Sequence, residues 1–472
     1  MTRREHLRRC WPLTIIAILV ASHASAQTTK TFDDIVDEYV AEGLRSNLAL
    51  RTETLEVEKA TAALSEARAR FFPELSLEAR YTRAEGGREI AIPLGSALNP
   101  VYSTLNQMLE AQGQPAQFPQ LTDETVPFLR PREQDTRLVF RQPIFAPAIP
   151  AAVRAQRALL NSSNYRRMAI ARGLRRDITL AYVDWLKARN SVGIVASSED
   201  LLRENLRVNQ SLFDNGKITE DQVLRARSEL LAVEQQKREA SNLSDQARSY
   251  FNFLLNRDLL APIEPTDPPA TETQSPSALE VQWSAALDRR PEIAQVEQLR
   301  KASEEQLRVA RKNRWPTLSL GIDGGTQGEE YRFGRGYNFA TGSLLFTWKL
   351  FDAGADAARV RQARASERQL VLRQEEVAQQ IRLEVQQAYD RLVTARDSLA
   401  TAAARVDAAR AAFRIASRKR DEGVISQVEF MDARNALTSA ELNHNITRFD
   451  VLARRAELEY ATSTGDLPLD PG

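Results

Sequence analysis

Two stretches of the chain follow the same plan at an offset of about 207 residues, far beyond the repeat length of a solenoid. Gly216 and Gly423 are corresponding positions, and each closes a long run rich in Ala, Arg, Glu, Gln and Leu. Upstream, Phe72-Pro73 corresponds to Trp315-Pro316, where the larger offset reflects a longer loop in the first half. The repeat predicts two halves of one plan: helix, strand, loop, strand, very long helix, tight turn and long helix.

The runs before the two glycines lack the residues that end helices. No glycine occurs between Gly354 and Gly423, and no proline between Pro316 and Pro468, which leaves nearly 70 residues without a strong breaker. At 1.5 Å per residue, such a helix is a rod of roughly 90–105 Å. Its apolar residues form a thin seam, which favours coiled-coil packing over burial in one globular core. The seam contains Leu383, Ala388, Leu392, Leu399, Val406 and Phe413.

The repeat and its breakers predict the boundaries of the chain's segments. Residues 27–260 form the first repeat, with strands at about 73–83 and 136–145 and long helices at about 151–215 and 218–257. A Pro-rich linker over 261–276 precedes the second repeat at 277–464. The second repeat has strands at about 316–324 and 338–351, long helices at about 353–421 and 424–463, and a tail over 465–472.

Residues 1–26 have the layout of a cleaved signal peptide. Four arginines precede an apolar core over 11–20, and Ala24-Ser25-Ala26 offers small residues for cleavage. The alternative is an anchor that stays attached, but a core of about ten residues is too short to span about 30 Å of hydrocarbon. We therefore expect export from the cytoplasm.

The composition excludes several classes of function. The single cysteine, Cys10, precedes the cleavage site, so the mature chain has no disulfide or thiolate chemistry. His444 is the only histidine after position 26, so the usual metal sites cannot form, and we expect no metal and no cofactor. No nucleophile-base set is visible, which indicates that the chain is not an enzyme. The 64 basic and 63 acidic residues balance, which argues against nucleic acid as a partner.

The predicted strands alternate between apolar and polar residues. Leu75, Leu77 and Tyr81 share one face of the first strand, and Leu344 and Phe346 share one face of the last. This alternation is typical of a transmembrane β-barrel, although a small soluble sheet packed on helices would show it too. Lipid tolerates no open sheet edge, and about eight strands are needed to close a barrel. Copies must then combine; a cyclic trimer supplies twelve strands, while a dimer or tetramer stays open at this point.

The order of these features resembles the TolC family of outer-membrane efflux proteins. The resemblance rests on the duplicated plan, the Phe72-Pro73 and Trp315-Pro316 junctions, the Phe351-Asp352-Ala353-Gly354 strand exit, and the two glycine turns. It implies a mixed α and β fold in which a trimeric twelve-stranded transmembrane barrel continues into a long periplasmic α-helical barrel. It places the protein in the outer membrane of a Gram-negative bacterium, in contact with lipid, with a large part in the periplasm.

The resemblance also implies a function and partners. The channel would be a passive exit duct for small molecules, which an inner-membrane pump expels through a periplasmic adaptor protein. The outer component of a type I protein or peptide secretion system is an alternative. A soluble coiled-coil scaffold without a pore is an alternative from a different class.

The resemblance carries an acidic gate onto Glu429 and Asp432, six and nine positions after the second turn glycine. Their i, i+3 spacing places both carboxylates on one helix face. Three copies would form a ring that favours cations. An ordinary solvated face is the alternative. The family often has a further acidic residue six positions after the first turn glycine, and Gln222 stands there instead.

The two turns themselves resemble the tips that meet the adaptor. Ordinary helix capping explains the same residues, because glycine ends helices and Thr or Ser begins them. The candidate docking residues are Gly216, Ile218, Thr219, Gly423, Ile425 and Ser426. The long Pro-rich loop over 85–132 is predicted to fold over the outer mouth.

Overall fold

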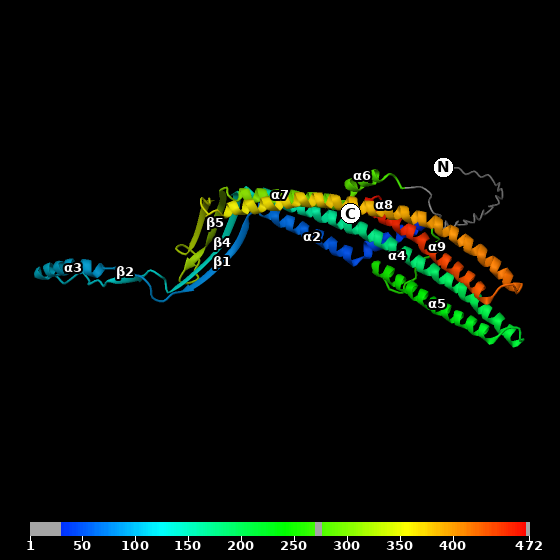
Figure 1. Ribbon diagram of the computed structural model, residues 1–472. Helices are drawn as coiled ribbons and strands as arrows, with labels where there is room; N and C mark the ends of the chain where they lie inside the picture. The colour runs from blue at the N-terminus through cyan, green and yellow to red at the C-terminus, as the bar shows by residue number, and fades with distance from the viewer. Residues whose placement is uncertain (1–29, 270–275, 469–472) are drawn as a thin grey trace, which may run out of the picture.

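The computed structural model describes residues 30–269 and 276–468. The predicted signal peptide lies outside these residues, as do parts of the predicted linker and tail. The molecule is elongated, with a bundle of very long helices at one end, a curved sheet in the middle and a thin extension beyond the sheet (Figure 1). Of the described helices, none is both long and apolar enough to cross a bilayer.

Helices make up most of the chain. The two longest, α4 and α8, each have 67 residues, which corresponds to about 100 Å. Each is followed by a turn and a second helix that runs back along it. The helices are α1 (Phe32–Ser46), α2 (Leu48–Ala69), α3 (Leu94–Ala111), α4 (Ala148–Asp214), α5 (Glu220–Leu254), α6 (Leu279–Arg289), α7 (Pro291–Lys312), α8 (Ala355–Asp421) and α9 (Gln427–Thr462).

The long helices pack side by side along much of their length (Figure 1). α4 packs against α5, α8 packs against α9, and α4 also packs against α9, so the two hairpins join into one four-helix layer. Nearer the sheet, α2 continues the bundle along α4, and α7 lies between α4 and α8. The shorter helices of each half thus extend the layer where the returning helix of each hairpin has ended.

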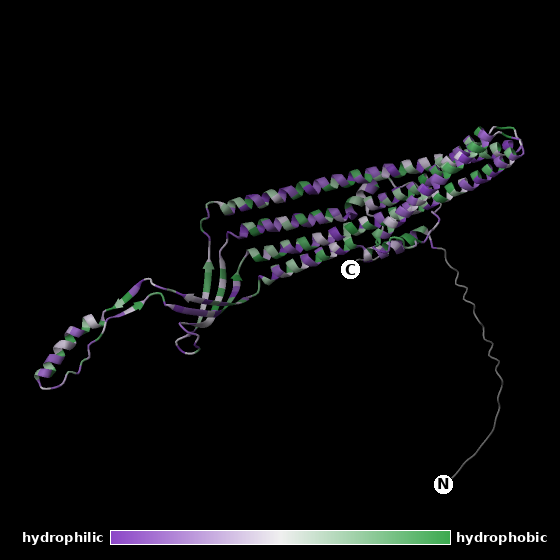
Figure 2. Cartoon of the chain, turned by 90° about the horizontal axis from the view of Figure 1, so that it is seen from below, coloured by the Kyte–Doolittle hydropathy of each residue, from purple (hydrophilic) through white to green (hydrophobic). Residues whose placement is uncertain are grey.

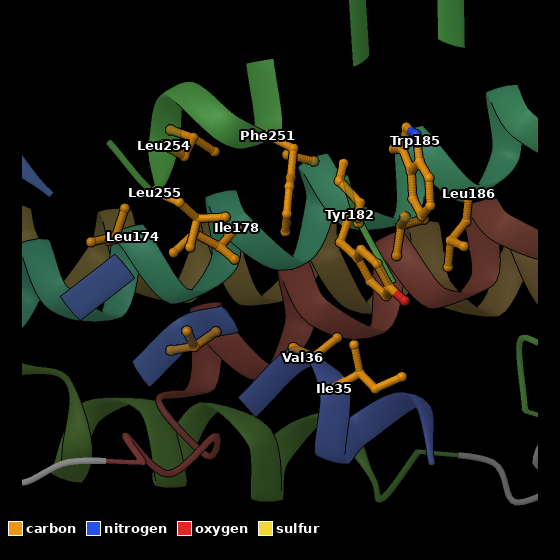
Figure 3. Close-up of a cluster of buried hydrophobic side chains, with 14 of the residues drawn as sticks. Ile35, Val36, Leu174, Ile178, Tyr182, Trp185, Leu186, Phe251, Leu254 and Leu255 are labelled. Atoms are coloured by element: carbon orange, nitrogen blue, oxygen red, sulfur yellow. The ribbon is translucent and has the colours of Figure 1, made fainter. Parts of the chain in front are cut away.

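The largest core cluster lies midway along the bundle, where α1, α4, α5 and α9 meet. Tyr182 and Phe251 are fully buried there, with ring centroids 5.7 Å apart (Figure 3). The Tyr182 hydroxyl donates a hydrogen bond of 2.8 Å to the Glu264 carbonyl oxygen, and burial raises the pKa of Tyr182. This bond fixes the start of the Pro-rich linker against α4.

The strands form a four-stranded antiparallel sheet and a separate hairpin. The sheet has the order β1-β4-β5-β6, so its neighbours follow one another along the chain, and β4 joins the first half to the second. The hairpin pairs β2 with β3. The strands are β1 (Glu74–Arg83), β2 (Glu89–Ile92), β3 (Glu124–Pro127), β4 (Arg132–Phe145), β5 (Thr317–Gly328) and β6 (Asn338–Thr347).

The register of the sheet separates an apolar face from a polar face. Leu75 lies opposite Phe140, and Leu320 lies opposite Leu344, so the apolar residues of all four strands share one side. Many of these side chains are exposed; Leu344 is 68% exposed. The other side carries ion pairs, such as Arg137 Nη2 to Glu78 Oε2 at 2.9 Å. No described helix packs across either face, in contrast to a soluble sheet covered by helices.

The loop between β1 and β4 contains structure of its own. β2 and β3 form a narrow stalk, and α3 lies at its far end, away from the rest of the molecule (Figure 2). Gly86 and Gly87 have φ values of 73° and 109°, a region that glycine adopts without strain, and they form the bend between β1 and the stalk.

Candidate functional site: the helical tips

Both turns at the end of the bundle have the same backbone geometry. Gly216 and Gly423 have φ values of 66° and 72°, in the left-handed region. After each glycine, the next amide donates back to a helix carbonyl, Lys217 to Leu212 and Val424 to Lys419, each at 2.8 Å. These are Schellman bonds, which satisfy the last carbonyls of a helix. The two glycines are therefore required by the backbone of each tip.

The second helices of the two hairpins begin differently. Ser426 forms a full capping box: its Oγ accepts from the Glu429 amide at 3.2 Å, and Glu429 Oε2 accepts from the Ser426 amide at 3.0 Å. Thr219 occupies the matching N-cap position but makes no side-chain capping bond to the backbone; its hydroxyl donates to Asp221 instead. Side-chain capping therefore fits Ser426, whereas Thr219 holds the position through backbone geometry alone.

Glu429 and Asp432 lie on the first turns of α9, and both side chains are exposed. Their spacing places the two carboxylates near each other on one face of the helix. Within one subunit, Glu429 is already engaged by its own capping box, which holds its carboxylate toward the tip. The pair forms an acidic edge at the end of the bundle.

A hydrophobic cluster beneath the tips joins the two hairpins. Phe430 is 2% exposed and Met431 is 7% exposed, and they pack among residues of α4 and α5. Ile425 of the second turn is half-buried against this cluster, whereas Ile218 of the first turn is half-buried without belonging to it. The other candidate docking residues are exposed. The cluster residues are Val195, Leu202, Leu230, Val233, Phe430 and Met431.

Charged residues beside the cluster also link helices. Glu199 of α4 is only 6% exposed in its side chain, and it accepts from Lys237 of α5 at 2.7 Å and from Arg203. The hydrogen bond from Lys237 is the main cause that lowers the pKa of Glu199. This ion pair joins α4 to α5.

Arg434 is a buried cation that the sequence did not single out. It is 3% exposed; its Nη1 donates to Asn435 Oδ1 at 3.2 Å, and burial lowers its pKa while the charge of Glu229 opposes that shift. Its counterpart in the first repeat, Arg227, is exposed. The two arginines hold corresponding positions in the repeat, yet only Arg434 is buried by the packing of the helices.

His444 is half-buried and lines a groove between α4, α8 and α9 together with Arg189 and Arg410. Among residues 30–269 and 276–468, no group of three His, Cys, Asp or Glu side chains is placed to hold a metal ion. The groove belongs to the helix packing and carries no catalytic arrangement.

Comparisons with known proteins define the class of the fold. The chain is similar to the outer-membrane channel OprN, with 20% identity, coverage of 92% of this chain and 91% of that one, and a TM-score of 0.74. It is similar to the outer-membrane channel CmeC of Campylobacter jejuni, with 17% identity, coverage of 92% and 86%, and a TM-score of 0.75. The open state of the MtrE channel of Neisseria gonorrhoeae has 17% identity, coverage of 92% and 89%, and a TM-score of 0.70. The fold is that of outer-membrane channels.

A family model adds a sequence-based similarity over part of the chain. The profile of the family described as outer membrane efflux protein matches residues 283–464, which contain most of the second repeat. The predicted resemblance to the TolC family of outer-membrane efflux proteins is thereby confirmed. Members of this family are channels and not enzymes, in agreement with the interpretation of the sequence. No curated protein sequence matches the chain.

Proposed function

We propose that this protein is the outer-membrane exit duct of a multi-component efflux system, acting as a homotrimer with a twelve-stranded barrel. The observation that carries the proposal is the two-faced sheet, whose apolar side chains are exposed and whose β1 and β6 each have one unpaired edge. In a single subunit surrounded by water, exposed apolar side chains and unpaired backbone groups at the sheet edges both raise the free energy of the fold. Lipid would cover the apolar face, and neighbouring subunits would pair the edges.

The polar face of the sheet supports a water-filled interior. Glu78 and Arg137 form an ion pair across β1 and β4, and Arg80 and Asp135 approach to 3.7 Å on the same side. Charged pairs of this kind suit the lumen of a channel, whereas the lipid face of a barrel is apolar. With the apolar faces outward, the polar faces of three such sheets would line a water-filled duct.

The length of the helices supports a periplasmic tunnel. α4 and α8 leave the sheet and run about 100 Å to the tips, a distance far beyond the thickness of a bilayer. Their narrow apolar seams pack within the layer, and the charged remainder is suited to water. Three such layers would close into a helical barrel that continues the duct toward the inner membrane.

The state of assembly tests this proposal directly. Purified in mild detergent, the chain is expected to have the mass of three copies, and to conduct ions in single-channel recordings from planar bilayers. A monomer that conducts nothing would contradict the proposal and favour a soluble scaffold.

We propose that Glu429 and Asp432 contribute to a cation-selective constriction at the tips of the assembled channel. Their exposure and common face support this role, because three copies would bring six carboxylates to one axis. The Glu429→Gln, Asp432→Asn double variant is expected to lower cation selectivity and block by divalent cations. Glu441 of α9, which is bound by Arg410 at 3.2 Å, provides a matched control as Glu441→Gln. Unchanged reversal potentials in the double variant would contradict the proposed constriction.

We propose that the two turns are the surface that meets a periplasmic adaptor, through which an inner-membrane pump delivers its substrate. The exposed Gly216, Thr219, Gly423 and Ser426 at the very end of the bundle support this role. Gly423→Pro removes the amide that donates to Arg420 and should abolish pump-dependent export while the trimer persists. Normal export by an intact trimer of this variant would contradict docking at the tips.

A further inference from the structure

The outer extension ends in a helix with an uncovered apolar seam. Exposed apolar side chains of α3 follow one another at spacings of four, three, four and three residues, which is the a and d spacing of a coiled coil. Val101 is 53% exposed and Met108 is 58% exposed. No other helix or strand of the described chain packs on α3. The seam consists of Leu94, Leu98, Val101, Leu105 and Met108.

The neighbouring face of α3 is already occupied by the segment that returns from it. Asn99 exchanges hydrogen bonds with the backbone of Leu121 at 2.7 and 2.8 Å. One heptad later, Asn106 does the same with the backbone of Phe118 at 2.8 and 3.0 Å. The ring of Tyr102 contacts Phe118, with centroids 5.3 Å apart. The extension is therefore a built unit with a defined shape, and its seam is the side left without a partner.

We propose that the seam binds the same seam of the other two copies of this chain, so that three α3 helices form a parallel bundle over the outer opening of the channel. This inference rests on the proposed trimer. Rotational symmetry would place three identical extensions on one rim, each carrying the same heptad pattern. A repeated a and d seam is self-complementary in such an arrangement.

The dimensions allow the three helices to meet on the axis. A twelve-stranded barrel with strands about 4.8 Å apart and tilted by about 40° has a radius of roughly 12 Å. The β2–β3 stalk has four paired residues on each strand, or about 13 Å, which spans that radius, so that the 18 residues of α3 can then run along the axis. Gly86 and Gly87 at the base of the stalk allow the bend that this approach requires.

Charge favours this occupant over a lipid surface. Glu110 is the only charged residue of α3, and the positions that flank the seam on its open side are Ala97, Thr104 and Ala111. Small, uncharged flanks let helices approach closely without like-charge repulsion. Helices that lie on an anionic membrane surface usually carry Lys or Arg on their polar face, and α3 has none. Anchoring on a common barrel also raises the effective concentration of the three short helices, which would be marginal alone.

The seam can be tested by cysteine cross-linking, because Cys10 is the only cysteine and lies within the predicted signal peptide. Leu105→Cys places a thiol in the seam, and Gln107→Cys places one on an exposed face of the same helix. After oxidation of the purified protein in mild detergent, Leu105→Cys is expected to give disulfide-linked dimers containing up to about two thirds of the chains, because each trimer leaves one thiol unpaired. Gln107→Cys should remain monomeric in denaturing gels, and Leu98→Cys, one heptad earlier, should behave like Leu105→Cys.

The native mass of each variant distinguishes a failure of the α3 bundle from a failure of the proposed trimeric channel. A trimer in which Leu105→Cys and Leu98→Cys cross-link no better than Gln107→Cys would overturn the α3 bundle and leave the proposed channel intact. A monomeric native mass would instead refute the channel proposal, and the bundle with it. Quenching of a fluorophore at Leu105→Cys by quencher-bearing lipids would show that lipid covers the seam. Full exposure of that fluorophore to water in the trimer would show that no other copy covers it. Either result would overturn the bundle.

Discussion

From the two-faced sheet we predict how an arginine on either face of β6 changes stability, and the expected change depends on whether lipid or water covers that face. Leu344 lies on the apolar face of β6 and Ser343 lies on the polar face, and both are exposed. If lipid covers the apolar face, Leu344→Arg must place a guanidinium in hydrocarbon, whereas Ser343→Arg places one in the lumen. In water, Leu344→Arg would be neutral or would improve solubility.

The size of the effect follows from the position of Leu344 in the strand. It is three residues from Thr347, the end of β6, or about 10 Å along the strand and roughly 8 Å along the membrane normal at a tilt of about 40°. This depth lies between the interface, where arginine costs about 0–1 kcal/mol, and the midplane, where it costs about 2–4 kcal/mol. We expect a destabilisation of about 2 kcal/mol per subunit, or roughly 30-fold in the folding equilibrium of each sheet.

Denaturant unfolding of the protein reconstituted in lipid vesicles measures this difference. Leu344→Arg should unfold at a clearly lower denaturant concentration than the parent chain, and Ser343→Arg should stay within about 0.5 kcal/mol of it. Equal stabilities of the two variants would refute the assignment of the apolar face to lipid. A greater loss for Ser343→Arg would show that the sheet faces the opposite way.

Two further predictions concern the helical bundle. Ser426→Ala removes the capping box and should cost about 1 kcal/mol, seen as lower thermal stability and faster amide exchange at the start of α9, whereas Thr219→Ala, which loses no side-chain capping bond, should cost less. Because the pKa of Glu199 is lowered in the folded chain, chiefly by Lys237, its contribution to stability is present above the ordinary value of 4.5 and is lost as the pH falls through the lowered pKa. Lys237→Met should therefore reduce the loss of stability in acid, measured as thermal unfolding from pH 6 to pH 3; an unchanged pH profile would contradict this role of the ion pair.

The long helices could be predicted because they depend on local properties of the sequence. A run without glycine or proline and with a thin apolar seam has few structures available to it, and α8 occupies that run. The strands were harder to delimit. β4 begins at Arg132 and passes through Pro143, where an irregularity in the register before Phe145 absorbs the interruption. β6 ends at Thr347, although alternation continues through Trp348 and Leu350. Pairing with a neighbouring strand, rather than alternation, decides these ends.

The difference between features set by local sequence and features set by tertiary packing also applies to the extension and to the tips. The sequence predicts a loop where α3 lies, because Gly95 and Pro100 stand inside it, although Leu98 and Leu105 are one heptad apart. The capping box could also be predicted from the sequence, since Ser426 and Glu429 have the required spacing. The burial of Arg434 could not be predicted, because its repeat counterpart Arg227 also follows an alanine and is nevertheless exposed.

The strand order also restricts how subunits can associate. With four strands in antiparallel sequence, β1 and β6 run in opposite directions, so the β6 of one copy can accept the β1 of the next while both helical bundles point the same way. A twofold pairing of β1 with β1 would instead send one bundle to each side of the membrane and leave both β6 edges open. Because the sheet has an even number of strands, copies with parallel bundles must join the β6 edge of one to the β1 edge of the next. Such an assembly is complete only when the last copy pairs with the first and closes a ring.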